Sequence, residues 1–177
     1  MIFKLTKIIN GCKNQNLKSQ EKLYKHFFGK MMNISLRYTG NYHDASEVVN
    51  SGFFKVFNKI DSFQQKGSFE NWIKRIMINT ALDHIKSDKT AKELQLNIDE
   101  NEFLIENETL ENIDEKEIIS FIQQLPPTSR AVFNLYVIEG YKHSEIAKKL
   151  DMSEGTSHWH LSNARKLLKQ KIENTKK

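Results

Sequence analysis

The sequence predicts an all-α fold with two small helical domains joined by an acidic linker, the C-terminal domain containing a helix-turn-helix. Three observations support this prediction. Apolar residues recur at intervals of three and four through most of the chain, without the strict alternation of a strand. Only 7 glycines and 2 prolines interrupt its 177 residues. A polar, acidic segment at about residues 88–113 lacks the helical period and divides the chain.

The composition excludes several classes of protein. Hydrophobic residues make up 38% and charged residues 28% of the chain, which is typical of a soluble protein. No apolar run approaches the length of a membrane span, and the N-terminus MIFKLTKIINGCKNQ lacks the apolar core of a signal peptide, so we expect no membrane insertion. Cys12 is the only cysteine, so an internal disulfide and a cysteine zinc cluster are excluded. We expect a cytoplasmic location.

The charge of the chain is unevenly distributed. Residues 1–92 carry a net charge of +9, residues 93–117 carry −9, and residues 118–177 carry +5. Two basic blocks on either side of an acidic strip suit a polyanionic partner, because contacts to phosphates supply most of the non-specific affinity for nucleic acid. The alternative is that the charges only keep the protein in solution, and for the acidic strip this interpretation is favoured.

The first domain, residues 1–90, is predicted to contain four helices, at about residues 2–10, 19–38, 44–60 and 69–87. The third helix has the most regular apolar stripe. Phe54 falls outside that stripe, where an aromatic side chain is usually incidental but can anchor a partner. Ser68 is a suitable N-cap for the fourth helix.

The linker, residues 91–113, leads to the second domain, residues 114–177. Here Pro126-Pro127 separates helices predicted at about residues 114–125 and 128–139. Gly140 is well placed to cap the second of these in the left-handed conformation. Because a linker of this composition is expected to be flexible, we predict only weak contact between the two domains.

The stretch YKHSEIAKKLDMSEGTSHWHLSNARKLLKQK, residues 141–171, has the pattern of a helix-turn-helix. A short helix, 144–150, ends at Asp151-Met152. Ser153 can then cap a longer helix whose apolar residues share one face. The outward residues near its start are predicted to be Ser157, His158, Trp159 and His160, placed to meet base edges, while basic residues further along, Arg165 and Lys166 among them, would hold phosphates. A plain helical hairpin with a solvated basic face is the alternative.

A second candidate surface is the loop DSFQQKG, residues 61–67, with the helix that follows it. The helix carries Trp72, Lys74, Arg75 and Asn79. Glutamine, lysine and aromatic side chains in this combination can bind phosphates and stack on an unpaired base. Trp72 can equally belong to the core, as tryptophans in amphipathic helices usually do.

The pattern of residues does not indicate catalysis. The six histidines are scattered, and His158 and His160 diverge on one helix, so they are a poor metal pair. The sequence contains no phosphate-cradling loop, nucleophile elbow or dinucleotide fingerprint. We therefore expect neither an enzyme nor a cofactor or metal site.

Three stretches together resemble the extracytoplasmic-function (ECF) group of bacterial RNA polymerase sigma factors. HDASEVVNSGFFKVF is similar to the family's polymerase-binding helix. IDSFQQKGSFENWIKRIMINTALDHIK is similar to its promoter-melting loop and minus-ten-reading helix. LPPTSRAVFNLYVIEGYKHSEIAKKLDMSEGTSHWHLSNARKLL is similar to the domain that reads the minus-thirty-five element. The acidic linker resembles the family's connector.

The resemblance implies three sets of site residues. Those expected to bind core RNA polymerase are Asp44, Glu47, Asn50, Ser51, Phe54 and Lys55. Those expected to bind the minus-ten element, including a flipped base, are Phe63, Gln64, Lys66, Ser68, Phe69, Trp72, Lys74, Arg75 and Asn79. Those expected to bind the minus-thirty-five element are Thr156, Ser157, His158, Trp159, His160, Arg165 and Lys166. The implied partners are core RNA polymerase, promoter DNA and an anti-sigma factor, which could be membrane-anchored.

The chain departs from the family pattern at several positions. Asn50-Ser51 stands where the family usually has Gln and an acidic residue, and His158-Trp159 stands where Lys or Arg is usual. Asn163 replaces an arginine, and Asp151 replaces a glycine in the turn, where an aspartate tolerates the left-handed conformation. Two other classes therefore stay open: a DNA-binding regulator that has lost polymerase binding, and a helical interaction module.

Overall fold

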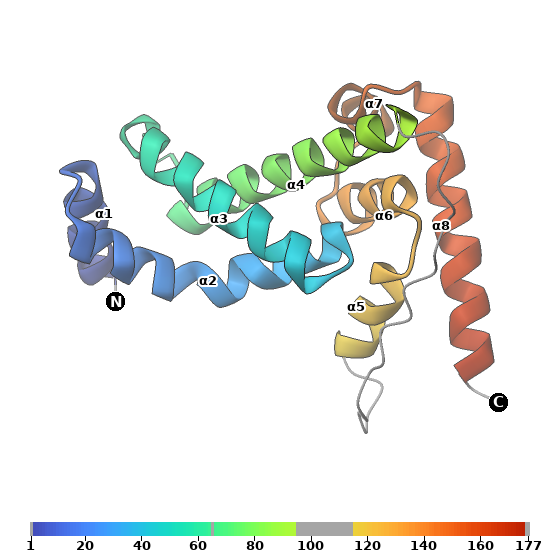
Figure 1. The fold of residues 1–177 in the computed structure, drawn as a ribbon, viewed down its shortest axis with the longest axis horizontal. Coiled ribbons are helices and arrows are strands. Elements are labelled where there is room, and N and C mark those ends of the chain that lie inside the picture. The colour runs from blue at the N-terminus through green and yellow to red at the C-terminus, as the bar shows by residue number, and fades with distance from the viewer. Residues whose placement is uncertain (1, 65, 95–114, 176–177) are drawn as a thin grey trace.

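The computed structural model describes residues 2–64, 66–94 and 115–175, and all regular secondary structure in these ranges is helical. Four long helices form the N-terminal half (Figure 1): α1 (Ile2–Lys13), α2 (Leu17–Thr39), α3 (Tyr42–Lys59) and α4 (Phe69–Leu94). A short 3₁₀ turn, η1 (Ile60–Ser62), follows α3. None of the described helices is both long and apolar enough to cross a bilayer.

Local signals explain where these helices begin and end. The side chain of Asn16 accepts a hydrogen bond from the Ser19 N–H at the start of α2, and Gly40 ends that helix at a φ of 87°. The Asn41 side chain then caps α3. As predicted, Ser68 caps α4, its Oγ accepting from the Asn71 N–H at 3.1 Å.

The core of the N-terminal half lies where α2, α3 and α4 meet. Its largest fully buried side chains include Leu23, Phe27, Met31, Phe53 and Met77. Gly52 is buried in the middle of α3, where a Cβ would meet the thioether of Met77. The missing side chain therefore lets α3 and α4 approach closely.

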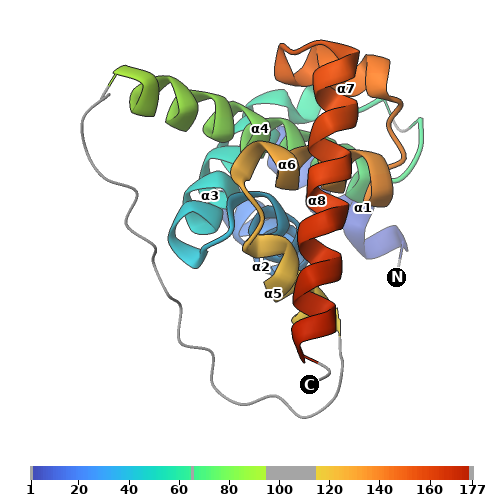
Figure 2. The ribbon, with the colours of Figure 1, turned by 90° about the vertical axis from the view of Figure 1, so that its right-hand side faces the viewer.

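The described part of the C-terminal half, residues 115–175, is formed by α5 (Glu115–Gln123), α6 (Pro127–Phe133), the π-helical turn η2 (Asn134–Ile138), α7 (His143–Leu150) and α8 (Glu154–Thr175). Pro127 occupies the first turn of α6, and Gly140 has a φ of 75°, both as predicted. Figure 2 shows α8 running beside α6, with α7 at one end of it. The pair α7 and α8 is the predicted helix-turn-helix.

The two halves pack closely together, so the prediction of weak contact between them is wrong. One apolar cluster joins Tyr38, Ile78 and Leu82 of the N-terminal half to Val132 and Leu135 of the C-terminal half. In Figure 1, α5 and α6 lie against α2, with α7 beside the second part of α4. A buried apolar cluster of this kind is a domain-like core, not a loose contact.

Helix α4 extends past the predicted end of the first domain, and the predicted domain bounds stay a prediction. Helix α4 continues to Leu94, four residues beyond the expected domain end at 90. Most of the acidic linker, from residue 95 onward, lies outside the described residues, as do residues up to 114. The predicted linker therefore begins as the last turn of a long helix.

Candidate nucleic-acid interface

The helix-turn-helix is held by contacts that the turn residues make themselves. Asp151 adopts the left-handed conformation, with φ 51° and ψ 53°. Ser153 Oγ accepts from the Thr156 N–H at 3.0 Å and so caps α8. His143, at the start of α7, contacts Ser157 Oγ through Nδ1 at 2.8 Å. These contacts fix the angle between the two helices.

The first turns of α8 present part of the predicted recognition set to solvent. Trp159 has 61% of its surface exposed, and Thr156 and His158 are also exposed. Arg165 and Lys166 are exposed further along the helix. An exposed indole on a recognition helix is free to contact a base edge or a thymine methyl group.

Two members of that set face inward, which corrects the prediction. Ser157 is completely buried and contacts His143. His160 is half-buried, with its Nδ1 2.9 Å from the Oγ of buried Ser129. Asn163 donates to the same hydroxyl at 3.4 Å. Ser157 and His160 lie one helical turn before the buried residues Leu161 and Ala164, so they belong to the inner face of α8. Their polar groups therefore make contacts within the domain.

A stack of rings links the turn to the exposed face of α8. The imidazole of His143 lies 3.6 Å from that of His158 and 4.6 Å from the ring of Tyr136, measured between centroids. The guanidinium of Arg165 lies over the ring of Tyr136, with its Cζ 5.9 Å from the ring centroid. Burial and the neighbouring His158 lower the pKa of His143, so it stays neutral at physiological pH.

A pocket of about 260 Å³ opens in the loop before α4. Six predicted minus-ten residues line it, namely Phe63, Gln64, Lys66, Ser68, Trp72 and Arg75. Asn71 also lines the pocket and was not predicted, although its position three residues after the cap Ser68 places it on the same first turn. The pocket thus combines an aromatic wall with amide, hydroxyl and cationic groups, as the binding of an unpaired base requires.

The two aromatic residues that line this pocket, Phe63 and Trp72, belong to a cluster of three rings. Phe63 lies 4.9 Å from Phe69 and 5.6 Å from Trp72, and Phe69 stacks on Trp72 at 5.4 Å. Phe69 is only 4% exposed and is not among the residues that line the pocket, so its predicted contact with DNA stays a prediction. It is a core residue that also packs on Phe27. Trp72 is half-buried, and one part of it belongs to the core while another lines the pocket.

The predicted polymerase-binding residues lie on α3. Glu47, Asn50, Ser51 and Phe54 are exposed, and Phe54 is 68% exposed. Asn50 accepts a hydrogen bond from the Tyr24 hydroxyl at 3.0 Å. Lys55 is half-buried and paired with Asp83 of α4 at 3.0 Å.

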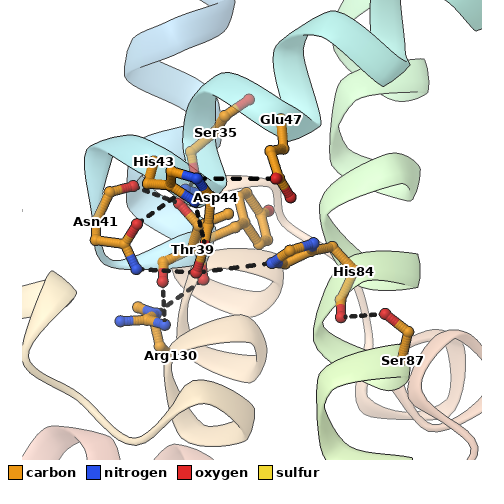
Figure 3. Close-up of polar contacts among 10 residues, drawn as sticks. Ser35, Thr39, Asn41, His43, Asp44, Glu47, His84, Ser87 and Arg130 are labelled. Atoms are coloured by element: carbon orange, nitrogen blue, oxygen red, sulfur yellow. Dashed lines mark hydrogen bonds and ion pairs between the residues drawn. The ribbon is translucent and has the colours of Figure 1, made fainter. Parts of the chain in front are cut away.

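Asp44 has a largely structural role within this set (Figure 3). Its backbone N–H and carboxylate both contact the Asn41 side chain, at 2.8 Å each, in a reciprocal cap of α3. The carboxylate also lies 3.7 Å from His84 Nε2 on α4. Burial opposes ionisation, but hydrogen bonds from Asn41 and His43 hold the pKa of Asp44 below its usual value.

The remaining minus-ten candidates lie along α4. Arg75 is exposed, at the rim of the pocket. Lys74 pairs with Glu139 of the C-terminal half at 2.7 Å, and Asn79 accepts from Lys149 of α7 at 3.1 Å. The structure therefore brings the loop residues together around one pocket, while contacts with the C-terminal half engage two of the helix residues.

These features define a class of protein. One half has a helix-turn-helix with an exposed recognition face, and the other has a pocket suited to an unpaired base. Three or more His, Cys, Asp or Glu residues placed to hold a metal ion are not found among the described residues. A helical protein with a helix-turn-helix and a second polar and aromatic pocket has the architecture of a nucleic-acid-binding protein.

Comparison with known proteins identifies the family. Residues 23–90 match the sigma-70 region 2 model, and residues 115–168 match the sigma-70 region 4 model. The chain is 27% identical over 164 residues to the ECF RNA polymerase sigma-E factor of Haemophilus influenzae, with 85% of this chain and 86% of that protein covered. It is 29% identical over 163 residues to the sigma-E factor of Escherichia coli, covering 85% and 83%. The chain belongs to the ECF subfamily of sigma-70 factors.

A solved structure shows the same fold. The sigma factor RpoE of Bartonella quintana, in complex with the anti-sigma factor NepR, matches 89% of this chain and 98% of its own, with a TM-score of 0.56 and 17% identity. With regions 2 and 4 both present, the chain is a sigma factor that binds core RNA polymerase and directs promoter-specific transcription initiation.

Proposed function

We propose that the pocket beside Trp72 captures a base flipped from the minus-ten element. The single observation that carries this assignment is the pocket itself, which joins an aromatic wall to the exposed cation Arg75. Removing a base from its stack costs a few kcal/mol, which stacking and phosphate contacts offset. Asn71 and Gln64 supply the amide donors and acceptors that would distinguish one base from another.

The minus-thirty-five element is read by α8 in this proposal. Thr156, His158 and Trp159 would face base edges, and Arg165 and Lys166 would hold phosphates. Because His158 and Trp159 stand where the family pattern has Lys or Arg, base contact there is more apolar than a lysine or arginine would make it. Fewer phosphate contacts also imply a shallower dependence of affinity on salt concentration.

The exposed face of α3 is the proposed docking surface for core polymerase, with Phe54 as its anchor. An aromatic side chain that is 68% exposed on an otherwise polar face is typical of a binding hot spot. Glu47, Asn50 and Ser51 would surround it as a polar rim.

The proposal includes regulation by a partner. The similar sigma factor of B. quintana is in complex with an anti-sigma factor, and we propose that a partner of the same class, which could be membrane-anchored, binds this protein. The protein would act in the cytoplasm, where polymerase and DNA are found, and would catalyse no reaction of its own. We further propose that residues 1–90 and 114–177 act as the two promoter-reading units.

A promoter selection tests these assignments together. Core polymerase and the protein transcribe a randomised promoter library, and sequencing of the transcripts reports the bases required at each position. Trp159→Ala should relax selection only near position minus thirty-five, and Asn71→Ala only near minus ten. Lys18→Ala, an exposed change on α2, is the matched control. If either variant altered both elements equally, or neither, the assignment of surfaces would be wrong.

A further inference from the structure

The recognition surface of α8 contains a pair of stacked imidazoles. The ring of His158 lies on that of His143, with 3.6 Å between the centroids and 28° between the planes. His158 stands where the family usually has a cation, Lys or Arg. We propose that the two histidines share one proton, so that His158 meets an acceptor on the minus-thirty-five duplex as a cation while neutral His143 positions it. This inference rests on the proposed reading of that element by α8.

His143 is a fixed support for the ring of His158. It is only 8% exposed, and its Nδ1 lies 2.8 Å from the Oγ of Ser157, which is completely buried. The ring of Tyr136 also stacks on it, with 4.6 Å between the centroids. His158 itself is exposed, and stacking occupies a face of its ring, which leaves the nitrogens at the ring edge for hydrogen bonds to DNA.

The pair can carry one positive charge but not two. Two cations at this separation repel each other strongly, so the two imidazoles titrate as one unit. Burial, and then the neighbouring His158, lower the pKa of His143. The buried ring is therefore the unfavourable place for the proton, and the exposed ring of His158 is the favourable one.

Two charged groups of α8 act on the pair in opposite directions. Glu154, in the first turn of the helix, raises the pKa of His143, whereas Arg165 lowers it. The guanidinium of Arg165 lies over Tyr136, the third ring of the stack. Because these two effects oppose each other, a polyanion that approaches His158 can decide whether the pair holds a proton.

Charged groups of α7 have partners of their own. Glu145 accepts a hydrogen bond from a backbone N–H at the start of the helix, at 2.8 Å. Lys149 and Asp151 lie at the opposite end of α7 from His143, where both contact side chains of α4. The charge of the histidine pair is therefore set mainly by the groups of α8 and by what approaches from solvent.

Contact with DNA should then be coupled to the uptake of a proton. An acceptor on the duplex stabilises the charged ring of His158 more than the neutral one, so DNA binds the protonated pair more tightly. The affinity should rise as the pH falls through the range where imidazoles titrate, near about pH 6.5, by at most about tenfold per pH unit for one proton. A lysine would be charged throughout this range. The histidine contact is thus the weaker one at neutral pH and matches a lysine only as the pH falls.

Promoter binding by the holoenzyme tests this coupling. The protein and core polymerase bind a fluorescein-labelled promoter taken from the selection described above, at about pH 6.0 and about pH 7.5. We expect roughly threefold to tenfold tighter binding at the lower pH. His158→Gln should lose this gain, and His158→Lys should bind tightly at both values. His26→Gln, an exposed change on α2, is the matched control and should keep the gain, since any effect of pH on the polymerase is common to all variants.

A second promoter, with its minus-thirty-five element scrambled, identifies the acceptor. A gain in affinity at low pH that persists on the scrambled promoter assigns the contact of His158 to a phosphate, because phosphates carry no sequence information. A gain that is confined to the selected promoter assigns the contact to a base edge. A gain of equal size in His158→Gln overturns the inference on either promoter.

Two changes at His143 test its positioning role. His143→Phe keeps a flat ring against His158 and cannot take a proton, so it should keep both the affinity and the gain at low pH. His143→Gln removes the ring and should weaken binding roughly threefold or more at both pH values. Equal affinities of these two variants, at matched melting temperatures, would refute the positioning role. The changes at exposed His158 decide the proton coupling even if a change at buried His143 lowers stability.

The outcomes separate this inference from the proposed function. If Trp159→Ala weakens promoter binding while His158→Gln keeps the gain at low pH, α8 reads the element and the proton coupling is refuted. If neither change alters binding at either pH, the proposed reading by α8 fails and the inference fails with it.

Discussion

The guanidinium of Arg130 lies directly against Gly40, so closely that a Cβ at residue 40 would overlap Nη1 (Figure 3 shows the guanidinium beside Thr39). Arg130 Nε donates to the Tyr38 carbonyl at 2.8 Å and Nη2 to the Thr39 carbonyl at 2.8 Å, while Nη1 donates to the Gln123 carbonyl. These are carbonyls at the C-terminal end of α2 and at the end of α5, where the helix dipole favours a cation. Burial lowers the pKa of Arg130 to about 10, so the side chain remains charged at neutral pH.

Gly40→Ala should therefore destabilise the protein by about 2–4 kcal/mol, because the new methyl group displaces Arg130 and the φ of 87° strains any L-residue. Urea denaturation measures the change. Gly140→Ala is the matched control, since its φ of 75° is similar and its Cβ would meet open space. That control should lose only about 1 kcal/mol. Equal losses in the two variants would show that the contact with Arg130 contributes nothing.

His143 should make stability depend on pH. Its pKa in the folded protein lies below the ordinary value of 6.5, so its contribution to stability is present above pH 6.5 and is lost as the pH falls below that value. Denaturation at about pH 7.5 and about pH 5.5 should show a larger loss for the natural protein than for His143→Gln, by up to about 1.4 kcal/mol per pH unit. His26→Gln, an exposed change on α2, should leave the pH dependence unaltered. Parallel pH profiles for the natural protein and His143→Gln would contradict this explanation.

Trp159→Ala should separate DNA recognition from stability. The indole is 61% exposed, so its removal is expected to change the free energy of unfolding by no more than about 0.5 kcal/mol. Transcription from a promoter that needs its minus-thirty-five element should fall roughly tenfold or more, since a lost base contact costs about 1–3 kcal/mol. Ile172→Ala, an exposed apolar change near the end of α8, serves as the control. A loss of stability matching the loss of transcription would count against a recognition role.

Phe54→Ala should weaken binding to core polymerase by roughly tenfold or more, as truncation of an aromatic hot spot does. Tyr42→Ala removes a comparably exposed ring, 65% exposed, from a different face of α3 and should have little effect. Affinity is measured by competition against a labelled sigma factor, with melting temperatures recorded for both variants. If the two changes weakened binding equally, Phe54 would not be the anchor of this surface.

Features that depend on local chemistry were predictable from the sequence. Asp151 and Ser153 predict the turn of the helix-turn-helix, and Ser68 and Pro127 predict where α4 and α6 begin. These features were predictable because caps and turns involve residues close together in the chain. The pocket residues of the loop were predicted through the family resemblance, and the structure places them around one cavity.

The inward orientation of Ser157 and His160 could have been predicted from the spacing of the apolar residues of α8. Steps of four back from Leu161 and Ala164 lead to Ser157 and His160, so the buried face extends to both. Their polarity made them candidates for DNA contact, although each has a polar partner inside the domain. Phe69 was predicted to bind DNA through the family resemblance, whereas its position at the start of the apolar stripe of α4 agrees with its burial.

The packing of the two halves could not be predicted from the pattern. Ile78 and Leu82 lie beside the main apolar stripe of α4 and are buried by residues of α6 and η2 more than 45 positions away. In the sequence, Arg130 and Asn134 have the pattern of ordinary polar residues of a helix. In the structure, their side chains donate hydrogen bonds to backbone carbonyls of α2, across the contact between the two halves. Periodicity shows which face is apolar, but not which distant element covers it.

The most direct test of the central claim is transcription in vitro from a randomised promoter library, using core RNA polymerase with the protein present or absent. We predict transcripts with defined start sites only in the presence of the protein, preceded by two shared sequence elements at a fixed spacing. Transcription that does not depend on the protein, or no transcription by a polymerase shown to work with another sigma factor, would contradict the claim that this chain directs promoter-specific initiation.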